Sequence, residues 1–362
     1  FIETTVNINE MLPNEFLYTD EIEFDTGSNQ QKVNLVTLVQ DAIFLYPEKF
    51  EDGSKDSLVL GINDEGEEVR MYGFELNEDD PINGNELHFT NQKPYVIYGY
   101  AGVPAGKTLE IDPGVRVYFH SESGIVVQPE GSININGTAS PNVDNPTENE
   151  VIFEGDRLEP VFADVPGQWG TVWLRQGSVN NTINHLTLKN AVVGLLVENC
   201  NLNIKNSQIY NSSNIGILSR ASAISGENLV VNNAGQAAFA ATIGGIYDFR
   251  FCTFNNNWNN PKQFAVLLSN YEKNQDNSIT AGDLVQANFY NCIIYGNNNV
   301  ELFFDIYDDV VFNYDFKYSL IKFNDSGTTI ANNKDYDFIR NQEEGNIKNK
   351  NPNFFDINNN QL

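Results

Sequence analysis

Between residues 186 and 323 the chain repeats one pattern of apolar and polar positions, about once every 21 to 23 residues. Each copy begins with a short segment that has apolar or small residues at alternate positions and usually ends in Asn. The six copies are Leu186-Leu188-Asn190, Ser207-Ile209-Asn211, Leu229-Val231-Asn233, Cys252-Phe254-Asn256, Cys292-Ile294-Gly296 and Ser319-Ile321-Phe323. Such alternation predicts strands with one buried face.

Each copy continues with two more apolar segments. The second segments cover residues 193–197, 215–219, 237–241, 264–268 and 300–304, and the third lie near 202–204, 224, 246, 285–287 and 310–312. Residues 270–283 lengthen one copy and read as an insertion. A repeat of about 22 residues is too short for a propeller blade. Because three short strands fill it, the repeat also contains no helix of the kind found in leucine-rich repeats. Stacked as coils, each strand would pair in parallel with its equivalent in the next coil. The pattern therefore predicts an all-β fold, a parallel β-helix.

The Asn residues are at the same alternate positions as the apolar residues, so their side chains are expected to point inward. Asn190, Asn211, Asn233 and Asn256 are therefore expected to form a structural ladder at one bend, bonding one another and the turn backbone. Cys252 and Cys292 have the same parity as Leu186 and Leu229, which predicts small buried residues rather than a disulfide framework.

The repeat does not cover the whole chain. Residues 1–90 predict a small acidic β-rich domain or cap, residues 91–325 the β-helix, and residues 326–362 a C-terminal cap or tail. The turn residues 63–66 predict a hairpin between strands near 57–60 and 69–74.

The net charge is −28, and residues 1–90 carry 21 Asp and Glu against 4 Lys and Arg. Nucleic acid is excluded as a partner, because nothing in this composition could neutralise phosphates. An acidic polysaccharide would also be repelled unless cations bridged it. No stretch of the chain given reaches the roughly 18 apolar residues that a membrane span needs.

Several segments resemble a known family. Residues 107–114 (KTLEIDPG), 154–158 (EGDRL) and 167–174 (GQWGTVWL), with the Asn-ended coils, resemble right-handed β-helix (pectin-lyase-like) surface lipoproteins of Bacteroidota. The resemblance implies a right-handed parallel β-helix solenoid. It also implies a protein on the extracellular face of the outer membrane, lipid-anchored upstream of Phe1.

The sequence does not assemble a catalytic site. Enzymes of the polygalacturonase kind combine three Asp, a His and an Arg-x-Lys on adjacent coils. Asp305, Asp308 and Asp309 are close in sequence, but no His falls in a neighbouring repeat and Arg-x-Lys is missing. Together with Asp276, which lies in a segment with alternating oxygen-bearing residues, these Asp are candidate ligands for Ca²⁺. We expect no other cofactor.

A possible binding surface lies near two Trp residues. Trp169 and Trp173 are four residues apart, and Arg157, Gln168 and Arg175 are close to them in sequence. If the strand begins at Gly170, Trp173 points outward, where it could stack on a sugar or anchor a protein interface. The alternative is that both Trp pack at the end of a coil.

Three functions remain open, one of which is an adhesin. The first is a non-catalytic cell-surface scaffold, an accessory subunit that presents a long rigid face to an outer-membrane or surface protein partner. The second is a carbohydrate-active protein, either a polysaccharide lyase or hydrolase or a glycan-binding module.

Overall fold

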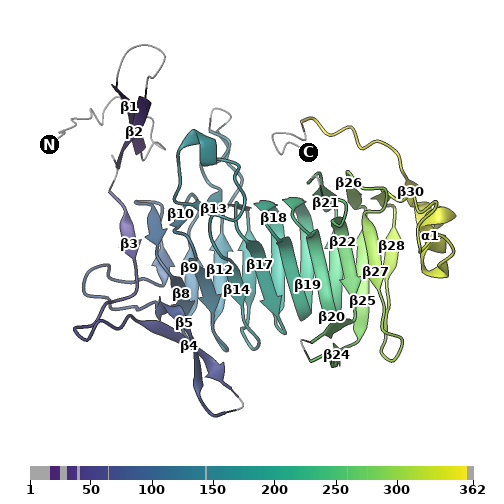
Figure 1. The fold of residues 1–362 in the computed structure, drawn as a ribbon, viewed down its shortest axis with the longest axis horizontal. Coiled ribbons are helices and arrows are strands. Elements are labelled where there is room, and N and C mark those ends of the chain that lie inside the picture. The colour runs from purple at the N-terminus through teal and green to yellow at the C-terminus, as the bar shows by residue number, and fades with distance from the viewer. Residues whose placement is uncertain are drawn as a thin grey trace.

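The computed structural model describes residues 17–24, 31–38, 41–63, 65–142, 145–258, 260–274 and 276–356. About 52% of the residues lie in strands and 4% in helices. The strands of successive coils stack side by side along the long axis of the molecule, with β3 near one end and α1 at the other (Figure 1). Three sheets, here called sheets I, II and III, form the sides of this stack.

The strands of each sheet pair in parallel with their equivalents in the neighbouring coils. Sheet I contains β3 (Ile43–Leu45), β7 (Tyr95–Ile97), β10 (Arg116–Phe119), β13 (Val151–Gly155), β16 (Leu186–Lys189), the second half of β18 (Asn201–Ser212), the end of β19 (Ile215–Ala234), β21 (Thr253–Asn256), β26 (Ile293–Gly296), β29 (Leu320–Ile321) and β30 (Ile347–Lys348).

Sheets II and III follow sheet I in each coil. Sheet II contains β5 (Glu68–Glu75), β8 (Tyr100–Val103), β11 (Gly124–Val127), β14 (Val172–Leu174), β17 (Val193–Glu198), the start of β19, the start of β20 (Ala237–Arg250), β22 (Phe264–Ser269) and β27 (Leu302–Asp305). Sheet III contains β6 (His88–Phe89), β9 (Thr108–Ile111), β12 (Ser132–Asn136), β15 (Asn181–Asn184), the start of β18, the middle of β19, the end of β20, β25 (Leu284–Tyr290) and β28 (Asp315–Lys317).

The side chains between the sheets form one continuous core. In sheet I, Val117, Phe153, Leu188, Ile209 and Val231 are in register and buried. The residues at the alternate positions point away from this column, as the pleat requires. This inward stacking of equivalent residues confirms the predicted all-β parallel β-helix.

Two details differ from the sequence pattern. Residues 310–312 were expected to be a strand; Phe312 forms an isolated parallel bridge with Leu284, and the strand of that coil is β28, where Asn288 pairs with Asp315. Parallel pairing also begins ahead of Tyr95, since β3, β5 and β6 pair with β7, β8 and β9. The division of the chain into domains at residues 90 and 325 stays a prediction.

The bend between sheets III and I is made by one residue per coil in the left-handed region. His185, Asn206, Asn228, Phe251, Asn291 and Tyr318 have φ between 48° and 56° there. Three Asn at this bend form a ladder of amides: Asn206 Nδ2 donates to Asn184 Oδ1, and Asn228 Nδ2 donates to Asn206 Oδ1, both at 2.9 Å. Asn favours this conformation because its short polar side chain tolerates it.

The four Asn of the repeated pattern lie at the next bend, between sheets I and II. Asn190 donates to Ala163 O at 2.8 Å, and Asn256 donates to Ala234 O at 2.8 Å and to Phe264 O at 3.1 Å. Asn211 donates to the carboxylate of Asp164 at 3.3 Å, and Asn233 accepts from Asn257 N at 3.3 Å. These contacts attach the coils to loop backbone that would otherwise be unpaired.

The fifth copy has Gly296 where the earlier copies have Asn. A Cβ placed on Gly296 would lie 2.2 Å from Glu301 Oε1, so the carboxyl group of Glu301 occupies the space of the missing side chain. Glu301 Oε1 accepts from Asn298 N at 2.7 Å. A buried acid has thus taken over the turn-binding role of the Asn amide.

We expect Asn206→Ala to lower the free energy of unfolding by about 1–2 kcal/mol. The substitution removes the two hydrogen bonds that the Asn206 amide makes with Asn184 and Asn228, and it places Ala in the left-handed region. Urea unfolding measures the change. Asn203→Ala is the matched control, because that exposed side chain makes no hydrogen bond within the described part of the chain; equal losses for both variants would contradict the ladder's role.

Segments outside the stack cover its ends and extend its bends. β4 (Ser57–Ile62) and β5 form the predicted hairpin, and β1 (Leu17–Phe24) pairs antiparallel with β2 (Gln31–Leu38). The predicted insertion is a second hairpin of β23 (Tyr271–Lys273) and β24 (Ile279–Ala281). The helical segments are Pro160–Phe162, Lys334–Tyr336, α1 (Asp337–Arg340) and Glu343–Gly345. None of the helices in the described ranges is long and apolar enough to cross a membrane.

The C-terminal helical segments close the last coil. Tyr336 is fully buried, and its ring stacks on Phe304 at 4.8 Å and on Phe323 at 4.9 Å. Its hydroxyl accepts a hydrogen bond from Phe304 N at 2.8 Å. The core is therefore protected from water at this end, as a solenoid requires.

Candidate functional site

The outer side of sheet II carries an apolar face. Trp173, Leu196, Leu218, Ala240, Leu267 and Phe303 are in register on six successive strands. Their neighbours along each strand point inward: Val172, Leu195, Ile217, Phe239, Val266 and Leu302 are fully buried. The column must therefore point outward. At about 4.8 Å per strand it is roughly 24 Å long.

A second column widens this face. Ile215, Ala237 and Ala240 form a hydrophobic cluster separate from the core, against which Leu218 and Leu267 pack. The rings of Phe264 and Phe303 stack with their centroids 4.9 Å apart. We call these residues, together with Trp173 and Leu196, the apolar face. Ile215, Ala237 and Ala240 are buried among their larger neighbours, and the larger side chains Trp173, Leu196, Leu218, Phe264, Leu267 and Phe303 are each partly exposed. The exposed parts of these six side chains form an apolar surface in contact with water.

A charged row borders the apolar face on the side of sheet III. The guanidinium group of Arg220 lies 2.9 Å from Glu198 Oε1 and 2.5 Å from Glu272 Oε2, the latter in the β23–β24 hairpin. Partial burial opposes its charge, but these two carboxylates raise the pKa of Arg220 above its ordinary value. Trp173 Nε1 donates to Glu198 Oε2 at 2.7 Å, which fixes the ring at the edge of the face.

Four of the five residues proposed for binding separate into two groups. Trp173 and Arg175 lie at the N-terminal end of the apolar face, where the guanidinium group of Arg175 is 5.4 Å from the ring centre of Trp173. Arg157 instead stacks on Phe162 and pairs with Glu159 at 3.0 Å. Gln168 donates to Phe162 O at 2.6 Å, so both residues belong to the loop that links sheets I and II.

Trp169 must be removed from the candidate binding residues. Only 1% of it is exposed, its ring stacks on Phe119 at 4.2 Å, and its Nε1 donates to Lys189 O at 2.9 Å. Trp169 is therefore part of the core and does not share the outer surface of Trp173. The strand begins at Val172, after a bend that turns Trp169 into the core.

The Asp candidates for a metal are dispersed. Asp276 Oδ1 accepts from the backbone and hydroxyl of Ser278, and Asp305 Oδ1 accepts from the Tyr271 hydroxyl at 2.9 Å. Asp308 and Asp309 lie in an exposed turn. Within the described ranges, no group of three or more His, Cys, Asp or Glu is placed to hold a metal ion. Ca²⁺ binding by these Asp stays a prediction.

Sheet I carries a row of titratable side chains that the sequence pattern did not reveal. Lys189 Nζ lies 2.6 Å from Glu154 Oε2, and both side chains are less than one-fifth exposed. Arg116 donates to the backbone oxygens of Glu150 and Thr147, in the loop before β13. Because these groups bind one another and the loop, we assign them to holding the loop on the sheet.

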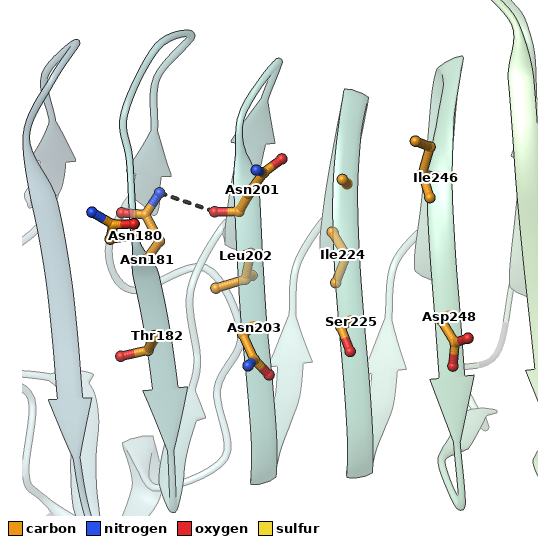
Figure 2. Close-up of a pocket in the computed structure, with 11 residues that line it drawn as sticks. Asn180, Asn181, Thr182, Asn201, Leu202, Asn203, Ile224, Ser225, Ile246 and Asp248 are labelled. Carbon is orange, nitrogen blue, oxygen red and sulfur yellow. Dashed lines mark hydrogen bonds between the residues drawn. The ribbon is translucent and has the colours of Figure 1, made fainter.

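A hollow lies on the outer side of sheet III, again outside the sequence prediction. Its volume is about 370 Å³, and it crosses β15, β18, β19 and β20 (Figure 2). Thr182, Asn203, Ser225 and Asp248 follow one another along it, in register. The signal was present in the sequence, because these polar residues recur at steps of 21, 22 and 23.

Comparisons with known proteins add little to this description. No protein-family model and no curated protein matches the sequence. One solved structure that matches is the Azotobacter vinelandii mannuronan C-5 epimerase AlgE6 A-module, at 13% identity, covering 69% of this chain and 82% of that chain with a TM-score of 0.29. The assignment of this chain as a parallel β-helix rests on its own strand register.

Proposed function

We propose that this protein is a non-catalytic β-helix scaffold that binds a protein partner through the apolar face of sheet II. The observation that carries the proposal is the continuous column from Trp173 to Phe303. The equivalent outward column of sheet III contains Thr182, Asn203, Ser225 and Asp248 instead. The same coils thus present a polar surface on one side and an apolar surface on another.

The arrangement of the first coils supports a protein, rather than another kind of ligand, as the partner that covers the apolar face. There, the β4–β5 hairpin already covers the outer side of sheet II: a Cβ placed on Gly102 would lie 2.5 Å from Leu58 Cδ2. Val126, which is in register with Trp173, is fully buried. Arg175 donates to Leu60 O and Gln128 donates to Val59 O, which ties the hairpin to this surface. The apolar face begins where the hairpin's cover ends.

The composition of the face fits a binding surface. Trp and other aromatic residues contribute more binding free energy than most residues at protein interfaces. Trp173 lies at one end of the face and the stacked Phe264 and Phe303 rings at the other. The Glu198–Arg220–Glu272 row provides the polar rim that surrounds such surfaces.

The cellular setting is part of the proposal. The resemblance to Bacteroidota surface lipoproteins supports a lipid-anchored position on the extracellular face of the outer membrane, with an outer-membrane or surface protein as the partner. A face that runs along a rigid solenoid suits an accessory subunit, because the partner meets a preformed surface.

Site-specific photo-cross-linking in the source cells tests the proposed interface. A photoreactive amino acid at position 218 or 267 is expected to yield the same discrete cross-linked protein. At position 208, on the outer side of sheet I, it is expected to yield none. Leu218→Glu should abolish the cross-link from position 267, because a carboxylate at the centre of the face would be desolvated without a partner.

The matched control for that charge is Gln208→Glu, which should leave the cross-link from position 267 unchanged. Both side chains point outward, so circular dichroism should show both variants folded. Equal cross-linking from positions 208 and 267, or a cross-link that survives Leu218→Glu, would overturn the proposed interface.

A further inference from the structure

We infer that the hollow on sheet III is a binding site for a neutral polysaccharide, independent of the apolar face on sheet II. The hollow exists because small side chains lie in the middle of the row. Ala223 and Ser225 on β19 lie between Asn201 and Asn203 on one side and Ile246 and Asp248 on the other (Figure 2). The taller neighbours form the two walls.

A second hollow continues the first one toward the bend between sheets II and III. Its volume is about 490 Å³, and it shares Asn201, Ala223 and Ile246 with the first. The segment 281–283, which follows the β23–β24 hairpin, forms its far wall. Each hollow has the volume of a typical small-ligand site. Because the two hollows share these residues, they form one groove.

The side chains of the groove have unused hydrogen-bonding groups. Within the described part of the chain, the side chains of Asn201, Asn203 and Ser225 make no hydrogen bond, and all three are exposed. An Asn amide both donates and accepts, and a Ser hydroxyl does the same. These are the groups that pair with the hydroxyls of a sugar.

The apolar part of the groove suits the other side of a sugar ring. Ala223 and Ile246 line both hollows, and 45% of Ile246 is exposed. Val285, also exposed, extends this strip in the second hollow. A pyranose presents C–H groups on its faces and hydroxyls at its edges, so it can cover the apolar strip while its edges reach the Asn and Ser side chains.

The charges select an uncharged chain over an acidic one. No Lys or Arg is among the described residues that line either hollow. The nearby cations are paired: Lys205 Nζ lies 2.8 Å from Glu227 and Arg250 Nε lies 2.8 Å from Asp248. A uronate would thus find no unpaired cation on the described residues that line the groove, on a protein of net charge −28.

The repeat of the groove suits a polymer. Equivalent residues on neighbouring coils are about 4.8 Å apart, which is close to the length of one hexose in an extended chain. A polysaccharide lying along the solenoid axis would therefore present successive sugars to Thr182, Asn203 and Ser225 in turn.

Affinity electrophoresis of the full chain in gels that contain a soluble polysaccharide tests the inference. The probes are neutral β-glucan, xyloglucan and galactomannan, with pectate and alginate as the acidic arm. At least one neutral polymer is expected to retard the protein, and the acidic polymers are not. Ala223→Trp, which fills the groove, should weaken the binding at least tenfold, and Asn203→Ala should weaken it several-fold.

The control is Gln208→Trp, which adds the same ring on sheet I and should leave the retardation unchanged. Leu218→Glu should also leave it unchanged, so that the groove and the apolar face are tested separately. The inference is overturned if no neutral polymer retards the protein, if only pectate or alginate does, or if Ala223→Trp binds as the unmodified protein does. Thermal unfolding of each variant shows whether a loss of binding reflects a loss of fold.

Discussion

Phe249→Ala is expected to lower the free energy of unfolding by about 3–5 kcal/mol. Phe249 is fully buried, and its ring centre lies 4.9 Å from that of Phe239, 5.1 Å from Phe254 and 5.2 Å from Phe289. The ring also fills the space above Gly226, where a Cβ would lie 2.4 Å from it. Ala would leave a cavity bounded by several coils, which a stack of short strands cannot close without shifting its register.

The matched control is two residues away. Phe251, at the bend that follows, is 59% exposed, and Phe251→Ala is expected to change stability by no more than about 0.5 kcal/mol. Urea unfolding of both variants measures the difference. Similar losses at the two positions would mean that the inward and outward faces of this coil are wrongly assigned.

The second large effect is a dependence of stability on pH caused by Glu301. This side chain is fully buried, and burial raises its pKa to about 8 from the ordinary 4.5. Its Oε2 has no hydrogen-bond partner among the residues that the structure describes, so the protonated form is favoured in the fold. Between these two pKa values the folded chain keeps a proton that the unfolded chain has released.

Stability must therefore fall as the pH rises. The contribution of Glu301 to the free energy of unfolding is fully present below about pH 4.5 and is lost as the pH rises past about 8. The difference between the two pKa values corresponds to a loss on the order of 5 kcal/mol. Glu301→Gln keeps an acceptor for Asn298 N without the acidic proton, so we expect its stability to lack this loss.

Urea unfolding from pH 5 to pH 9 tests this expectation. The two proteins should be similar at pH 5, and the Gln variant should be the more stable by several kcal/mol at pH 9. Glu67→Gln, in the exposed turn of the β4–β5 hairpin, controls for the removal of one negative charge. If the stability of Glu301→Gln falls with pH as steeply as that of the unmodified protein, another group is responsible.

The candidate surfaces were predictable to different degrees. Parity alone placed Trp173 on the outer side of its strand, because Val172 and Leu174 are apolar neighbours in a short segment. It could not separate Trp173 from Trp169, whose position depends on a bend that the local pattern does not show. The groove could not be predicted from the sequence. Its floor is formed by two small residues, Ala223 and Ser225, and it exists only because larger side chains of the adjacent coils stand on both sides of them.

The bends were also only partly predictable from the sequence. The positions of Asn190, Asn211, Asn233 and Asn256 could be read from their spacing, but their partners could not. Asn190 and Asn211 bind backbone or side chain at residues 163 and 164, in a loop far away in sequence. Amide-to-amide hydrogen bonds join Asn184, Asn206 and Asn228 at the bend between sheets III and I, where Asn206 and Asn228 have left-handed backbone.

By itself the sequence determined the architecture, because a period of about 22 residues with alternating apolar positions can be buried only if equivalent strands stack in register. It determined the inward column and most of the strands for the same reason. Only the tertiary structure decided which outward residues form a surface, since the apolar face and the groove each join side chains from several coils. It also decided that Glu301 replaces an Asn side chain at Gly296, because that contact depends on how one turn folds back into the space left by a missing Cβ.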